Sequence, residues 1–117
     1  MKDLHGEIGK GWIGVDLDGT LAYYDGWKGP TIIGDPIPKM LKRVKNWVSS
    51  GQDVRIMTAR VTPSKDDALL SRMAIQKWLE EKCGLFHIPI THAKDHLMLE
   101  LWDDRCIQVI PNTGELS

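Results

Sequence analysis

The chain has 117 residues, of which 42% are hydrophobic and 26% are charged, and this length predicts a single domain over residues 1–117. The 15 basic residues nearly balance the 16 acidic ones, giving a net charge of −1. This composition excludes a highly charged disordered tail, and the charge balance provides no overall field to attract nucleic acid or an anionic membrane. Binding of nucleic acid or of such a membrane would therefore need a local patch of charge on the surface.

Cysteine content and the N-terminal segment predict the compartment. Cys83 and Cys106 are too few for a disulfide framework and lack the paired spacing of a zinc site. Met1–Lys10 is polar, and no apolar run approaches the ~18 residues of a membrane span. We therefore expect a soluble cytoplasmic protein with no membrane partner. The sequence leaves the oligomeric state open.

The first half of the chain predicts a strand, helix, strand unit. Short apolar runs that end in charged residues predict buried parallel strands at Gly11–Asp16 and Asp53–Thr58. Between them, apolar residues at helical spacing predict a helix that begins near Pro38 and ends before Gly51.

The second half predicts another helix and three strands. Ser64 and Asp67 resemble a capping box, and Gly84 is a typical helix terminator, so we expect a helix over Ser64–Cys83. Further short apolar runs predict strands at Ile88–Thr91, Met98–Asp103 and Cys106–Ile110, followed by a turn at Pro111–Gly114. This alternation predicts a doubly wound α/β fold with a mostly parallel sheet of about five strands.

Polar residues gather where the predicted strands end, at the edge where ligands of such sheets bind. Four carboxylates at one edge would repel one another unless a cation neutralised them, and Mg²⁺ is the default oxygen-binding cation. The residues at these ends are Asp16, Asp18, Gly19, Thr58, Arg60, Lys94, Asp103 and Asp104.

These motifs resemble those of the haloacid dehalogenase superfamily. Asp-Leu-Asp-Gly-Thr after an apolar strand, Thr58, an isolated Lys94 and a strand running into Asp-Asp are similar to its four motifs, in the same order. The resemblance spans Gly11 to about Ile110 and implies a Mg²⁺-dependent phosphatase with an aspartyl-phosphate intermediate. It also implies a Rossmann-like three-layer sandwich, a flap at approximately residues 21–36 and, given the short insertions, no cap domain.

The resemblance assigns roles residue by residue. Asp16 matches the nucleophile and Asp18 the general acid/base, whose presence distinguishes phosphatases from the dehalogenases. Gly19 permits a sharp turn next to the substrate phosphate. Thr58 and Lys94 match the hydroxyl and the cation that contact the phosphoryl group.

The remaining assignments concern the metal and the substrate. The resemblance implies Mg²⁺ held by Asp16, the backbone carbonyl of Asp18, and Asp103 and Asp104, with Asp104 favoured as the direct ligand. Arg60 either grips the substrate phosphate or pairs with Asp66 or Asp67. The flap aromatics Tyr23, Tyr24 and Trp27 either cover a substrate or pack within the flap.

The sequence thus predicts a phosphomonoesterase acting on a small phosphorylated metabolite. An alternative is a phosphatase of nucleic-acid ends, because Asp-Asp-Arg at the end of the fourth strand together with Arg60 is similar to the phosphatase half of phage-type polynucleotide kinases. An alternative of another class is a non-catalytic binding module that keeps the fold. Nucleic acid is therefore an open but unfavoured partner.

Overall fold

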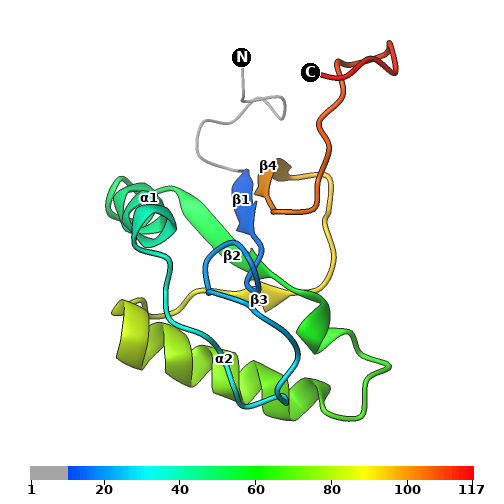
Figure 1. Cartoon of the computed structure of the whole chain (residues 1–117). Coiled ribbons are helices and arrows are strands. Elements are labelled where there is room, and N and C mark those ends of the chain that lie inside the picture. The colour runs from blue at the N-terminus through cyan, green and yellow to red at the C-terminus, as the bar shows by residue number, and fades with distance from the viewer. Residues whose placement is uncertain (1–10) are drawn as a thin grey trace.

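A computed structural model describes residues 11–117; the expectation about the polar segment Met1–Lys10 lies outside this range. Strands and helices alternate along the described chain up to the last two strands, which have no helix between them (Figure 1). The elements are β1 (Trp12–Val15), α1 (Pro38–Ser49), β2 (Asp53–Met57), the short 3₁₀ helix η1 (Ala59–Val61), α2 (Ala68–Cys83), β3 (Ile90–Thr91) and β4 (Met98–Trp102). No helix in this part of the chain is long and apolar enough to cross a membrane.

The strands form one four-stranded parallel sheet in the order β3-β2-β1-β4. The predicted α/β class and parallel sheet are therefore confirmed. Hydrogen bonding continues just past the strand ends, where the Asp16 N–H donates to the Trp102 carbonyl and the Thr58 N–H to the Thr91 carbonyl, both at 2.9 Å. These bonds hold the carboxyl ends of neighbouring strands at one edge.

Both helices pack on the same face of the sheet. One hydrophobic cluster contains alternate residues of the two central strands together with buried residues of both helices, among them Ile13, Val15, Val54, Ile56, Met40, Val44, Ile75 and Leu79. Alternate strand residues point to one face. Because β1, β2 and β3 are added in one direction, right-handed crossovers place α1 and α2 on that face together.

The predicted third layer is not formed by residues 11–117. Its helix would have to lie between β3 and β4, and residues 92–97 contain no helix. Side chains cover part of the opposite face instead: Trp12 is 0% exposed. Its Nε1 donates to Asp95 at 2.8 Å, and the Arg55 guanidinium lies 4.7 Å from the centre of one of its rings.

The predicted start of the second helix was wrong by about one turn. α2 begins at Ala68, and Asp67 occupies the N-cap position without a capping hydrogen bond from its side chain. Residues 62–68 form two turns, closed by Lys65 N–H to Thr62 O at 3.0 Å and Ala68 N–H to Lys65 O at 3.2 Å. These turns separate Ser64 from the helix. The predicted terminator is confirmed, since Gly84 has a φ of 66°.

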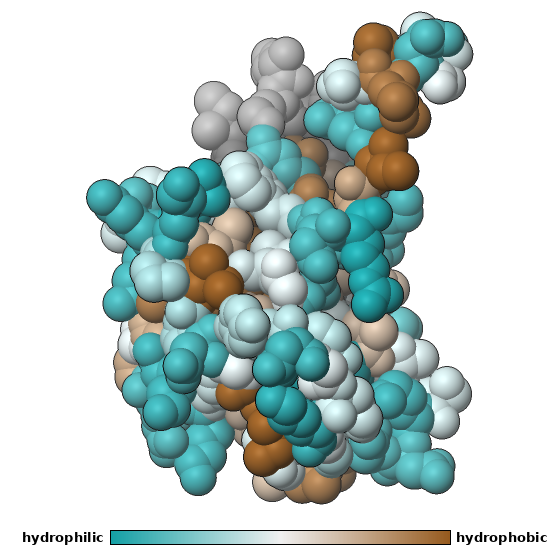
Figure 2. All heavy atoms as spheres, viewed as in Figure 1, coloured by the Kyte–Doolittle hydropathy of each residue, from teal (hydrophilic) through white to brown (hydrophobic). Residues whose placement is uncertain are grey.

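The predicted fifth strand at Cys106–Ile110 does not form. After β4 the chain leaves the sheet and extends away from the molecule (Figure 1), with apolar side chains facing solvent (Figure 2). Ile107 is 77% exposed. Val109 makes only an isolated antiparallel bridge to Leu116, around the predicted turn at 111–114. The apolar composition was correct for a strand, but no neighbouring strand is in place to pair with it.

Candidate active site

An acidic cluster lies at the carboxyl edge of the sheet. Asp16 follows β1 and the pair Asp103–Asp104 follows β4, which is the neighbour of β1. One carboxylate oxygen from each of these residues lies within 4.8 Å of the others. Three of the side chains predicted to surround a metal are therefore brought together. Their oxygen donors fit a hard cation such as Mg²⁺.

The electrostatics of Asp16 support this fit. Burial, the charge of Asp103 and a hydrogen bond with Asp104 raise the pKa of Asp16 to about 7 from its ordinary value of 3.8. A partly buried carboxyl beside two other acids gains little from ionising unless positive charge is supplied. A divalent cation held by these carboxylates would supply it.

Gly19 and Thr20 shape the loop against Asp104. Gly19 has a φ of +89°, and a Cβ atom there would lie 2.5 Å from Asp104 Oδ2. Thr20 Oγ1 accepts from the Asp104 N–H at 3.0 Å and donates to Asp104 Oδ1 at 3.3 Å. These bonds pair Thr20 with Asp104, across the gap between the loops after β1 and β4.

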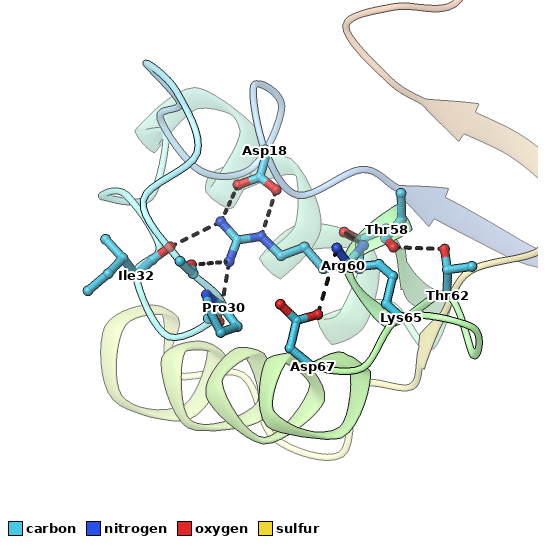
Figure 3. Close-up of polar contacts among 10 residues, drawn as sticks. Asp18, Pro30, Ile32, Thr58, Arg60, Thr62, Lys65 and Asp67 are labelled. Carbon is cyan, nitrogen blue, oxygen red and sulfur yellow. Dashed lines mark hydrogen bonds and ion pairs between the residues drawn. The ribbon is translucent and has the colours of Figure 1, made fainter.

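Asp18 lies apart from the acidic cluster and pairs with Arg60. Arg60 Nε donates to Asp18 Oδ2 and Nη2 donates to Asp18 Oδ1, both at 2.8 Å (Figure 3). This is the bidentate geometry in which a guanidinium binds a carboxylate most strongly. The predicted partners Asp66 and Asp67 are therefore wrong for Arg60, whose carboxylate partner is Asp18. The carbonyl of Asp18 as a metal ligand stays a prediction.

Thr58 is placed to contact a substrate. It is 4% exposed, directly after β2, and its Oγ1 accepts from the Arg60 N–H at 3.2 Å. That bond uses Oγ1 as an acceptor and leaves its own proton free to donate. Thr58 shares the wall of a cavity of about 570 Å³ with Asp16, Asp18 and both acids after β4. This volume is within the usual range for small-molecule sites.

The structure does not bring Lys94 to this cavity. β3 ends at Thr91, and the cavity wall includes the next residue, His92, whereas Lys94 is exposed and is not part of the lining. Its phosphate-binding role stays a prediction. Arg105 does line the cavity and forms no ion pair within the described chain.

Sequence reasoning missed His92 and Lys65 as cavity residues. His92 had a usable signal, because it is the first residue after a predicted strand and so belongs to the ligand-binding edge. Lys65 had none, since the sequence placed it inside a helix. It reaches the cavity because residues 62–68 form turns instead.

The flap aromatics differ in their surroundings. The Trp27 ring centre lies 4.7 Å from the Arg60 guanidinium and 5.2 Å from Lys65 Nζ. Trp27 therefore stacks on cations that lie outside the flap, and it also lines the cavity, so both alternatives for it stay predictions. Tyr24 lines the cavity, whereas Tyr23 is exposed and lines only a smaller neighbouring hollow.

Gly19 does not line the large cavity. It borders a smaller one of about 260 Å³ on the side of α1, with Thr20, Asp103 and Asp104. Its contact with the substrate phosphate stays a prediction, whereas the close approach of Asp104 is what the structure shows.

Comparison of the sequence with models of protein families finds no match, and comparison with curated proteins finds none either.

Proposed function

We propose that the protein is a Mg²⁺-dependent phosphomonoesterase of the haloacid dehalogenase type that acts on a small phosphorylated substrate. One observation carries the proposal: two carboxylates separated by a single residue have different surroundings within one cavity. Asp16 lies in an acidic cluster suited to a cation, while Asp18 is held outside that cluster by an arginine. A nucleophile and a separate acid/base need this difference.

In the first step Asp16 attacks the phosphorus atom. A bond forms between its carboxylate oxygen and phosphorus, and the bond from phosphorus to the leaving oxygen breaks. Asp18, which must first take up a proton from solvent, donates that proton to the leaving oxygen to give the free alcohol. Bound Mg²⁺ would keep Asp16 ionised and offset the charge of the phosphoryl oxygens. The Thr58 hydroxyl, buried at the cavity wall, can donate to one of those oxygens.

In the second step water releases the phosphate. Asp18, now a carboxylate, takes a proton from the water molecule as its oxygen bonds to phosphorus. The bond between phosphorus and the Asp16 oxygen breaks, which gives inorganic phosphate and restores Asp16. Each Asp18 oxygen accepts one bond from Arg60, which leaves a second lone pair on each for this proton.

The charge balance of the chain favours small phosphate esters over nucleic-acid ends. The near-neutral net charge provides little attraction to a polyanion.

The proposal is tested by turnover of 4-nitrophenyl phosphate, a sugar phosphate and a 3′-phosphorylated oligonucleotide. We expect turnover of the small esters with Mg²⁺, loss of turnover on chelation, and weak recovery with Ca²⁺, whose looser coordination would misplace the reacting groups. Asp16→Asn should abolish turnover. The matched control is Asp53→Asn, which removes a carboxylate at the opposite edge of the same sheet.

Three results would contradict the proposal. Wild-type rates in the Asp16→Asn protein would exclude Asp16 as the nucleophile. Binding of inorganic phosphate in calorimetry without turnover of any ester would support the binding-module alternative. Preferential cleavage of the oligonucleotide would instead support the nucleic-acid alternative.

A further inference from the structure

We propose that Arg60 is a positioning residue that fixes Asp18 in place and ties the flap to it. This inference rests on the proposed function for the role of Asp18, but its geometry stands independently. It gives Arg60 a task other than binding the substrate phosphate. It also implies that proton transfer by Asp18 requires an ordered flap.

The surroundings of Arg60 leave no donor for a substrate. Its side chain is 5% exposed, although arginine is seldom buried without partners. Nε and one N–H of Nη2 are used by Asp18. Nη2 also donates to the Ile32 carbonyl at 3.0 Å, and Nη1 donates to the carbonyls of Gly29 and Pro30 at 3.5 and 3.4 Å. Every N–H of the guanidinium therefore has an acceptor.

These acceptors belong to two segments that Arg60 joins. Figure 3 shows the side chain extending from η1 to Asp18, with Pro30 and Ile32 of the flap beside the guanidinium. Trp27, also in the flap, stacks on the same group. The backbone of Arg60 is itself anchored, because its N–H donates to Thr58 Oγ1. One side chain thus connects the end of β2, the loop after β1 and the flap.

The consequence for Asp18 follows from the two-point contact. A carboxylate on a short side chain can rotate, and a bidentate arginine fixes the direction of both oxygens. Proton transfer requires hydrogen-bond reach, so a rotated Asp18 would lose its effect even while present. Without Arg60, the flap carbonyls of residues 29–32 would also lose their common donor.

The first test uses the leaving group. An alkyl phosphate needs a proton on its leaving oxygen, whereas 4-nitrophenyl phosphate needs little. If Arg60 acts through Asp18, Arg60→Gln should slow aspartyl-phosphate formation from the alkyl ester by roughly 10²–10⁴-fold, the same loss that we expect for Asp18→Asn. Formation from the nitrophenyl ester should slow by about tenfold or less. KM should change little. Arg60→Lys should recover only part of the rate, because an ammonium group cannot bind both carboxylate oxygens in the planar geometry of a guanidinium.

Non-additivity sharpens this test. The double variant Asp18→Asn with Arg60→Gln should be no slower than Asp18→Asn alone, because the two residues act as one unit. Arg55→Gln is the matched control, since Arg55 also stacks on a tryptophan and pairs with aspartates, but on the face of Trp12 and Asp95. Equal losses on both esters, or additive losses in the double variant, would overturn the positioning role.

The second test does not depend on catalysis. Hydrogen exchange of the peptide covering residues 21–36 should be faster in Arg60→Gln than in the wild type or Arg55→Gln, with circular dichroism confirming the fold. Arg60→Lys provides the same comparison if the glutamine variant does not fold. Unchanged exchange would refute the tie to the flap. Faster exchange in a protein that cleaves no ester would uphold the tie while refuting the proposed function.

Discussion

At Asp16, burial and the neighbouring acids oppose ionisation, and this conflict makes the metal-free protein sensitive to pH. The pKa of Asp16 is raised to about 7 in the folded protein, from an ordinary value of 3.8. Between these values the folded state binds more protons than the unfolded state. The free energy of unfolding of the metal-free protein should therefore fall as the pH rises from 3.8 to about 7. Below this range the stabilising contribution of protonated Asp16 is fully present.

The expected outcome is a melting temperature in chelator that falls between pH 4 and 7 more steeply for the wild type than for Asp16→Asn, given the raised pKa of about 7. Mg²⁺ should reduce the difference at neutral pH by binding the ionised cluster. Thermal melts at several pH values measure this directly, with Asp53→Asn as control. If the melting temperatures of the two proteins fell in parallel with pH, Asp16 would not be the source of the pH dependence.

Gly19 offers a second test at the residue scale. Gly19 and Gly51 have nearly the same φ, +89° and +87°, but a Cβ at Gly19 would meet Asp104 while one at Gly51 meets nothing within 4 Å. Gly51→Ala should cost about 1 kcal/mol from the left-handed backbone alone. Gly19→Ala should cost about 2–3 kcal/mol and should also weaken Mg²⁺ binding by displacing Asp104.

Urea denaturation of both glycine variants, with Mg²⁺ titrations by calorimetry, checks this prediction. The comparison isolates the contact with Asp104 from the shared backbone strain. Equal costs, with Mg²⁺ affinity unchanged, would mean that the loop after β1 does not need its close approach to Asp104.

At the scale of elements, the two ends of α2 should respond differently to substitution. Ser64 lies before the helix, and no side-chain cap is present at its N-terminus, so Ser64→Ala should change stability by about 0.5 kcal/mol or less. Gly84 terminates the helix with a φ of 66°, so Gly84→Ala should cost about 1 kcal/mol. Chemical denaturation distinguishes the two. A loss of about 1 kcal/mol for Ser64→Ala would favour the capping box that the sequence predicted.

At the scale of the whole molecule, the C-terminal segment should be dispensable for folding. Residues 107–117 are all exposed and form no strand of the sheet. A chain ending at Cys106 should therefore unfold cooperatively, with a melting temperature within a few degrees of the full chain. A fifth strand in the sheet would have made the truncation strongly destabilising, so a large drop would show that this segment packs in solution.

The sequence by itself determined most of the local elements and the list of candidate site residues. The periodicity of the apolar residues and the nature of the flanking residues were enough to predict α1, β1, β2 and β4. These elements are defined by the faces that they bury, which the sequence pattern shows directly. Asp16, Asp18, Thr58, Asp103 and Asp104 were also identified, because each follows a strand that ends abruptly in polar residues and all open onto one cavity.

Only the tertiary structure decided how these residues pair. That Arg60 binds Asp18 rather than a neighbour on its own turn depends on contacts 42 positions apart in sequence. The side of the sheet that each helix covers, the absence of a fifth strand and the exposed position of Lys94 are likewise decided by packing between distant segments. Local periodicity reports which residues are apolar, but pairing energies depend on which partners the folded chain brings within reach.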